Sequence, residues 1–81
     1  MKISSVYKIL NSSNLMRNGN SFESKSHRFD VHTQLQGSVL FVRIIKKGVN
    51  GSVDYLNDID SSIIVKTLKE LRQRLSESSY L

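Results

Sequence analysis

The two histidines and a pair of aspartates are the side chains best suited to bind a metal ion or to catalyse a reaction. His27 and His32 stand five positions apart, and on a β-strand this odd spacing directs them to opposite faces, where they are not expected to share a metal ion. Asp58 and Asp60 could bind a divalent cation, but acidic residues before an amphipathic stretch more often form a turn and cap a helix. The chain has no cysteine and no nucleophile-elbow motif around a serine. We therefore expect no metal, no cofactor and no enzymatic activity.

Aromatic and basic side chains near the middle of the chain suit a different chemistry, the binding of a single-stranded nucleic acid. Phe41 is followed by Arg43 and Lys47 at even spacings, which a β-strand places on one face of its sheet. Aromatic rings on such a face stack on bases, and cations neutralise phosphates. The sequence thus predicts DNA or RNA binding through five residues of one sheet face, namely Arg28, His32, Phe41, Arg43 and Lys47.

The segment that must position these residues is 39–47, VLFVRIIKK, which contains the longest apolar run of the chain. β-branched and aromatic residues dominate it, and these favour a strand over a helix. Its side chains alternate between two faces. Because Arg43 interrupts one face, we expect the other face to contact the core through Leu40, Val42 and Ile44.

A second strand is predicted upstream, because residues 28–36 alternate between apolar and polar side chains. A two-residue turn at positions 36–37 fixes the register of this hairpin. The predicted core pairs are Phe29 with Ile44, Val31 with Val42, and Thr33 with Leu40. The predicted pairs on the outer face are Asp30 with Arg43 and His32 with Phe41.

Two further turns extend the predicted sheet. Asn50-Gly51 is a strong hairpin signal, and its turn would pair Lys47 with Asp54 and Ile45 with Leu56. Asn18-Gly19 offers another hairpin, between residues 15–17 and 21–23.

Helical patterns flank the predicted sheet. Residues 60–76 form an amphipathic helix with an apolar stripe expected to pack on the core face, made of Ile64, Leu68, Leu71 and Leu75. Residues 2–10 fit both a helix and an alternating strand, and we favour a short helix. The predicted fold is α+β, an antiparallel β-meander of three to four strands with a C-terminal helix on one face. We expect a single domain, with an N-terminal segment at 1–20, the sheet at 21–57 and the helix at 60–76.

The outer face of the predicted sheet also carries an apolar stripe, Val39, Phe41, Ile45 and Leu56. Contiguous apolar patches are rarely left exposed on monomers. Either the N-terminal segment or a second copy of the chain is expected to cover this stripe, and we expect a homodimer.

Charge and composition limit the partners. The formal net charge is +5, and residues 1–52 hold eight Lys and Arg against two Asp and Glu. A basic surface suits a polyanion, or an acidic patch on a protein. The alternative function is therefore a small inhibitor or adaptor module that binds an acidic protein. No apolar run is long enough to span a bilayer, the first residues are too polar for a signal peptide, and the lack of cysteine favours a reducing compartment, so we expect a cytoplasmic protein without membrane contacts.

One family pattern can be matched to these residues. The stretch SHRFDVH at 26–32, followed by GSVLFVRIIKKG at 37–48, a hairpin and an amphipathic helix, resembles the PUR (purine-rich element binding) domain and the wider whirly-type group. The family's basic-Arg-Phe opening matches Arg28 and Phe29, and its Asp-Val close would fall on Asp30 and Val31, with two intervening residues missing. This resemblance, over residues 20–76, implies four antiparallel strands and a helix, a dimer, and single-stranded DNA or RNA held on the sheet. A double-stranded-RNA-binding domain also looks similar, but residues 60–69 lack its lysine- and alanine-rich helix start.

Overall fold

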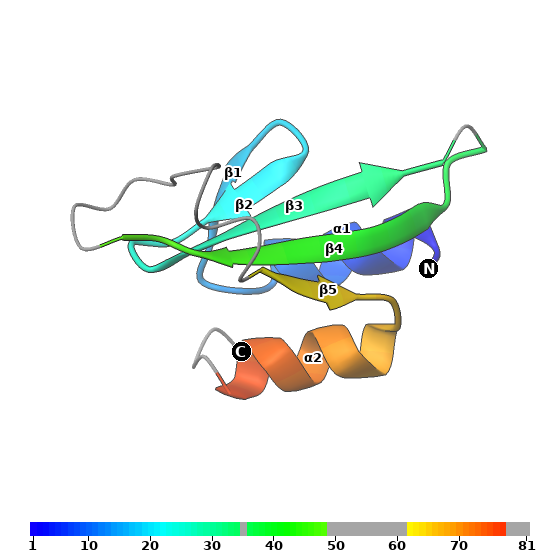
Figure 1. Cartoon of the computed structure of the whole chain (residues 1–81). Coiled ribbons are helices and arrows are strands. Elements are labelled where there is room, and N and C mark those ends of the chain that lie inside the picture. The colour runs from blue at the N-terminus through cyan, green and yellow to red at the C-terminus, as the bar shows by residue number, and fades with distance from the viewer. Residues whose placement is uncertain (35, 49–61, 78–81) are drawn as a thin grey trace.

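Two helices and one five-stranded antiparallel sheet make up the described part of the chain, residues 1–34, 36–48 and 62–77 of a computed structural model. The strands follow one another across the sheet in sequence order, which is a β-meander (Figure 1). The predicted α+β class is confirmed, although the sheet has one strand more than the three to four expected. The elements are α1 (Ile3–Asn11), β1 (Met16–Asn18), β2 (Ser21–Glu23), β3 (His27–Thr33), β4 (Val39–Lys46), β5 (Ile63–Val65) and α2 (Leu68–Glu77).

Helix α1 confirms the preference for a helix at the N-terminus. Its apolar residues recur at helical spacing, and three of them are buried, Val6, Ile9 and Leu10. The backbone ahead of the helix pairs with the start of β4, because the Met1 amine donates to the Val39 carbonyl at 2.8 Å and the Val39 N–H donates to the Met1 carbonyl at 2.7 Å. These two bonds fix the beginning of α1 against the sheet.

The hairpin predicted at Asn18-Gly19 is confirmed, except that Asn18 belongs to its first strand and not to the turn. β1 and β2 pair antiparallel, with Asn18 opposite Ser21, so the chain reverses through Gly19 and Asn20. Gly19 has a φ of +62°, a left-handed conformation that glycine adopts without steric cost. The hairpin brings residues 16–18 into the sheet, which therefore begins before the predicted position 21.

The hairpin of β3 and β4 has the predicted register over most of its length. Phe29 faces Ile44 and Val31 faces Val42, as expected. The prediction is wrong at the turn end, where a β-bulge pairs Thr33 with Val39 instead of Leu40. A bulge adds one residue to a strand and shifts the side-chain alternation beyond it.

The bulge exchanges the environments of two apolar residues. Val39, predicted on the outer face, lies in the core with 1% of its surface exposed, whereas Leu40, predicted in the core, is 48% exposed. The chain reverses near Gly37, which has a φ of +76°.

The C-terminal helix is shorter than predicted. Residues 63–65 form the strand β5, which pairs with β4 and places Val65 opposite Val42. Three β-branched residues in succession favour a strand, and here they gain the backbone hydrogen bonds of a neighbouring strand. The helix begins at Leu68, and the Thr67 hydroxyl accepts a hydrogen bond from the Glu70 N–H at 3.2 Å, as an N-terminal cap does.

Consequently the predicted apolar stripe of residues 60–76 is only partly correct. Ile64 lies on a strand and is 36% exposed, while Leu71 and Leu75 are fully buried; Leu68 is partly buried against the core. The downstream hairpin predicted at Asn50-Gly51, with its partners Asp54 and Leu56, lies outside the described residues.

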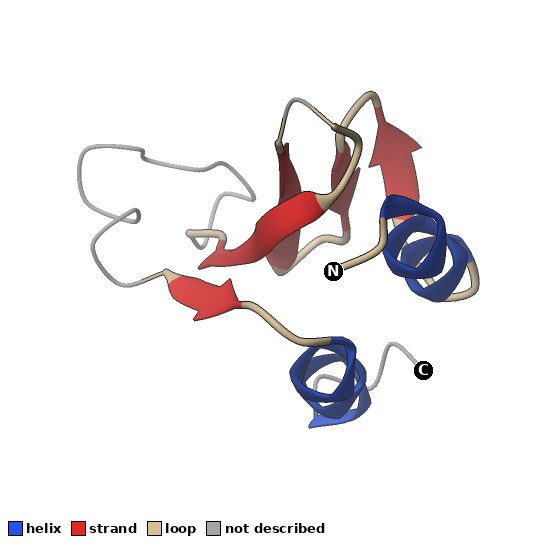
Figure 2. Ribbon diagram, turned by 90° about the vertical axis from the view of Figure 1, so that its right-hand side faces the viewer, coloured by secondary structure: helices blue, strands red, loops and turns tan. Residues whose placement is uncertain are grey.

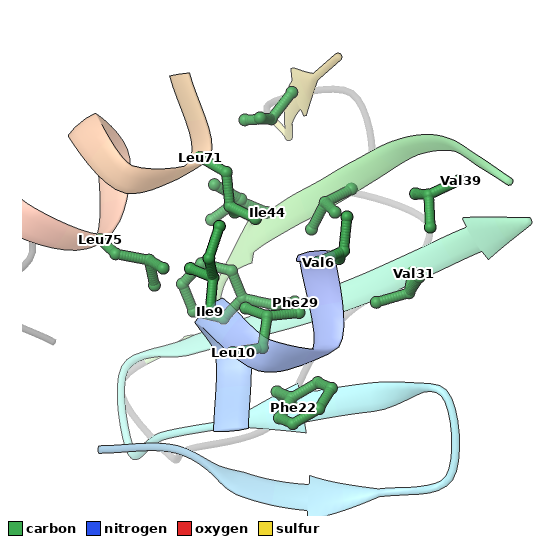
Figure 3. Packing of buried hydrophobic residues seen from close by; sticks show 12 residues of the cluster. Val6, Ile9, Leu10, Phe22, Phe29, Val31, Val39, Ile44, Leu71 and Leu75 are labelled. Carbon is green, nitrogen blue, oxygen red and sulfur yellow. The ribbon is translucent and has the colours of Figure 1, made fainter. Parts of the chain in front are cut away.

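Both helices pack against the same face of the sheet (Figures 1 and 2). This inner face and the two helices enclose a single apolar cluster, most of it labelled in Figure 3. Its buried members are Val6, Ile9, Leu10, Phe22, Phe29, Val31, Val39, Val42, Ile44, Val65, Leu71 and Leu75. The described helices therefore do not cover the opposite face of the sheet.

Candidate functional site

The side chains that alternate with the core residues define the outer face of the sheet. Strand register places them there, because successive side chains on a strand point to opposite faces. We use the term outer face for Glu23, Arg28, Asp30, His32, Phe41, Arg43, Ile45, Lys47 and Ile64. All five residues predicted to bind nucleic acid therefore lie on it.

Three of these five residues form one group, which we name the His32–Phe41–Arg43 cluster. The register puts His32 directly opposite Phe41, as predicted. Their rings stack, with centroids 4.5 Å apart and planes inclined by 25°. The Arg43 guanidinium lies 5.6 Å from the centroid of the Phe41 ring, within the range of a cation–π interaction. The cluster thus combines two flat rings and one flat cation.

Hydrogen bonding in the cluster is incomplete. Arg43 Nη1 donates to Ser62 Oγ at 3.0 Å, which joins β4 to the residue before β5. Arg43 has no ion pair with any residue that the structure describes. His32 Nε2 is buried without a hydrogen-bond partner within the described part of the chain. An arginine with spare donors is suited to bind an incoming anion.

The two other predicted residues are neutralised by acidic neighbours. Arg28 Nε donates to Asp30 Oδ1 at 2.8 Å. Asp30 does lie opposite Arg43 in the register, as predicted, but its ion pair is formed with Arg28, on its own strand. Lys47 Nζ lies 3.2 Å from Glu23 Oε1, and only 11% of the Lys47 side chain is exposed.

Of these two residues, Lys47 is also distant from the cluster, whereas Arg28 lies diagonally across the hairpin from Arg43. Lys47 follows Phe41 by six positions, which corresponds to about 20 Å along a strand. Ile45 lies between them on the same face, opposite Arg28, and is fully buried. The structure therefore brings His32, Phe41 and Arg43 together and places Arg28 and Lys47 in a second, charge-compensated group.

Two exposed apolar residues next to the cluster were missed by the sequence analysis. Ile64 lies opposite Arg43 and Leu40 precedes Phe41 in the bulge. The run of β-branched residues at 63–65 was an available signal for a strand and for the outward position of Ile64. The bulge has no comparable signal in the sequence.

His27 and His32 lie on opposite faces of β3, as predicted. His27 Nδ1 is 2.8 Å from Ser26 Oγ. Its partial burial, and to a smaller extent the charge of Lys46, lowers the pKa of His27 from the usual 6.5. A lowered pKa favours the neutral imidazole at neutral pH.

No group of three or more His, Cys, Asp or Glu residues that could hold a metal ion occurs among the described residues. Asp58 and Asp60, the pair considered as a cation site, lie outside these residues. None of the described helices has the length and apolar character needed to cross a membrane.

Comparisons with known proteins found no match for this chain. No protein-family model matches the chain, and neither the curated proteins nor the solved structures that were searched contain a match. The resemblance to the PUR domain therefore depends on the sequence motif alone.

Proposed function

We propose that this protein binds single-stranded DNA or RNA on the outer face of its sheet, without catalysing a reaction. The observation that supports this most directly is the His32–Phe41–Arg43 cluster. The rings and the guanidinium plane, which are partly exposed on this sheet face, offer stacking surfaces to unpaired bases. Neither described helix covers this face, and the PUR-like motif of the sequence is consistent with the proposal.

The proposed roles differ from residue to residue. Phe41 and His32 stack on bases, and Arg43 binds a phosphate or stacks on a neighbouring base. Arg28 and Lys47 contribute less, because each already forms an ion pair, with Asp30 and Glu23 respectively. Releasing either cation for a phosphate would leave a partly buried carboxylate without its partner.

The experiment measures the affinity for labelled single-stranded oligonucleotides by fluorescence anisotropy over a range of salt concentrations. Phe41→Leu removes the ring but keeps an apolar side chain beside His32, so the fold is retained. Because stacking contributes about 1–3 kcal/mol per base, the affinity should fall at least about fivefold with an unchanged salt dependence. Arg43→Gln should flatten the slope of log affinity against log salt by about 0.7, the single-strand value for one phosphate contact.

Lys69→Gln is the matched control, since Lys69 is exposed on α2, away from the outer face, and like Arg43 forms no ion pair within the described residues. Arg28→Gln combined with Asp30→Asn removes the whole ion pair and should weaken binding less than Arg43→Gln, because the net charge of the outer face does not change. The proposal is wrong if Phe41→Leu leaves the affinity unchanged, or if Lys69→Gln weakens binding as much as Arg43→Gln. Either result would mean that oligonucleotides bind through net charge alone.

A specific observation favours the second candidate function, a protein-binding module. Leu40 is 48% and Ile64 36% exposed; Leu40 directly precedes Phe41 in the chain, and Ile64 lies opposite Arg43. Exposed apolar residues around an arginine are common at protein interfaces. Under this alternative, oligonucleotides bind weakly and independently of Phe41. A pull-down from nuclease-treated extract then recovers one acidic protein with the wild-type chain and loses it with Ile64→Ser.

We also propose that the chain forms a homodimer, though not through the whole apolar stripe expected from the sequence. Val39 belongs to the core and Ile45 is already buried. β5 is the last strand of the described sheet, and an edge strand presents unpaired backbone groups to a second copy. Sedimentation at micromolar concentration should show a dimer that Ile64→Lys converts to a monomer; a monomeric wild type would contradict the proposal.

A further inference from the structure

A groove between the two helices is lined mainly by polar and charged side chains, which belong neither to the apolar core nor to the outer face. It has a volume of about 380 Å³ and is lined by Ser5, Lys8, Ile9, Ser12 and Arg72. Four residues come from α1 and the turn that ends it, and one comes from α2. Since both helices pack on the inner face, the groove is separated from the His32–Phe41–Arg43 cluster by the sheet.

Two cations line this groove, and among the described residues no acidic one does. Neither Lys8 nor Arg72 belongs to an ion pair formed within the described residues. Their own helices offer them no partner. Helix α1 contains no Asp or Glu, and Arg72 has no acidic residue three or four positions away on α2, the spacing at which helical side chains meet.

The remaining polar groups of the groove are donors. Ser5, Lys8 and Ser12 follow one another by three and four positions, so they share one side of α1. The Ser5 hydroxyl forms no hydrogen bond with a described residue, while Ser12 Oγ donates to the Lys8 carbonyl at 2.8 Å and ends the helix. The groove therefore presents a guanidinium, an ammonium and one unengaged hydroxyl.

This donor set matches a phosphate group. A guanidinium can bind two phosphate oxygens through paired N–H donors, an ammonium binds as a point charge, and a hydroxyl donates one further bond. Two positive charges beside one groove also raise its electrostatic potential, and a bound anion reduces the repulsion between them. A volume of about 380 Å³ falls at the small end of the range typical of ligand sites.

We propose that the groove between α1 and α2 binds the phosphate group of a small molecule, either inorganic phosphate or a phosphate monoester. The site is independent of nucleic-acid binding on the outer face, because it uses other residues on the other side of the sheet. Lys8 and Arg72 provide the charge, and Ser5 donates the additional hydrogen bond.

The test is a titration of the ¹⁵N-labelled protein, followed by amide chemical shifts at constant ionic strength, with inorganic phosphate and glycerol phosphate in separate series. Chloride is the reference anion. Saturable shifts are expected at Ser5, Lys8, Ser12 and Arg72, with unchanged resonances at His32 and Phe41. Tighter binding of one of the two ligands identifies whether the site takes the free anion or the ester.

Two double variants separate a site from general attraction to a basic protein. Lys8→Gln with Arg72→Gln removes both groove cations and should weaken phosphate binding by at least about tenfold, since charge-assisted hydrogen bonds are lost. Lys66→Gln with Lys69→Gln removes the same charge from exposed lysines that do not line the groove, and should leave binding nearly unchanged. Circular dichroism verifies that both variants fold.

The proposal is overturned if phosphate causes no more shift than chloride, if the shifts do not saturate, or if both double variants weaken binding equally. Loss of oligonucleotide binding by Phe41→Leu has no bearing on these outcomes. The two proposals can therefore fail separately.

Discussion

The assignment of residues 63–65 to a strand, where the sequence predicts a helix, can be tested by comparing two substitutions, Leu71→Ala and Ile64→Thr. Both residues belong to the apolar stripe predicted for one helix, which would bury them together. In the structure Leu71 has no exposed surface, whereas Ile64 is 36% exposed on the outer side of β5. Threonine keeps the β-branched shape that suits a strand, so Ile64→Thr changes mainly the apolar burial at this position.

The observed strand and the long helix expected from the sequence predict clearly different losses of unfolding free energy for Ile64→Thr. Leu→Ala at a fully buried site costs about 3 kcal/mol or more because it leaves a cavity. A domain of this size has a total stability of about 4–12 kcal/mol, so Leu71→Ala should lower the Tm by about 12–24 °C. Ile64→Thr on an exposed strand position should cost less than about 1 kcal/mol. On a buried helical stripe it would instead cost about 2 kcal/mol or more, because a hydroxyl would be buried without a partner.

Equilibrium unfolding in urea measures both values, with the m-value as a check that unfolding remains cooperative. Gln73→Ala, an exposed position on α2, provides the baseline, expected within about 0.5 kcal/mol of the wild type. If Ile64→Thr destabilises the protein as much as Leu71→Ala does, β5 is wrongly assigned and the single long helix is correct. If Leu71→Ala costs no more than Gln73→Ala, the packing of α2 on the sheet is wrong.

Two further predictions concern the histidines. His32→Phe should raise the Tm by about 4–8 °C, because it replaces a buried nitrogen that has no partner among the described residues, which recovers about 1 kcal/mol, and keeps the stacking on Phe41. A lower Tm in a thermal melt would indicate that the nitrogen has a partner. Because burial and Lys46 lower the pKa of His27 below 6.5, the unfolded chain binds more protons between the folded pKa and 6.5, so stability should decrease as the pH falls below 6.5. His27→Gln should reduce this dependence in urea unfolding at several pH values, and identical pH profiles for the two proteins would contradict the assignment.

The parts of the fold that the sequence predicted are those fixed by local alternation. Phe29 and Val31 face Ile44 and Val42 as expected, because slipping the register by one residue would turn every apolar side chain of β3 outward. The same reasoning placed His32 opposite Phe41, the central contact of the candidate site. The hairpin at Gly19 was predictable because its turn needs a residue that tolerates a positive φ.

The parts that it missed depend on contacts between distant segments. A bulge changes which residue faces the core by one position, and it moved Leu40 out and Val39 in. At this bulge the backbone of Val39 also bonds to Met1, far away in the sequence, so contacts between distant segments act here as well as local alternation. Residues 63–65 read as helix because the apolar stripe continues through them, but pairing with β4 favours the strand that their β-branched side chains prefer.

The candidate site shows the same division between local and distant effects. A count of charges suggested that Arg28, Arg43 and Lys47 were equivalent phosphate ligands, yet two of them already have acidic partners. Asp30 could reach either Arg28 or Arg43, and its pairing with Arg28 leaves Arg43 without an ion pair in the described part of the chain. The positive charge available to a ligand on the outer face is thus concentrated beside the stacked rings of His32 and Phe41. A ligand that combines one flat ring with one negative charge, as a nucleotide does, fits that arrangement better than a purely ionic polymer would, which is why Phe41→Leu and Arg43→Gln are the decisive pair of variants.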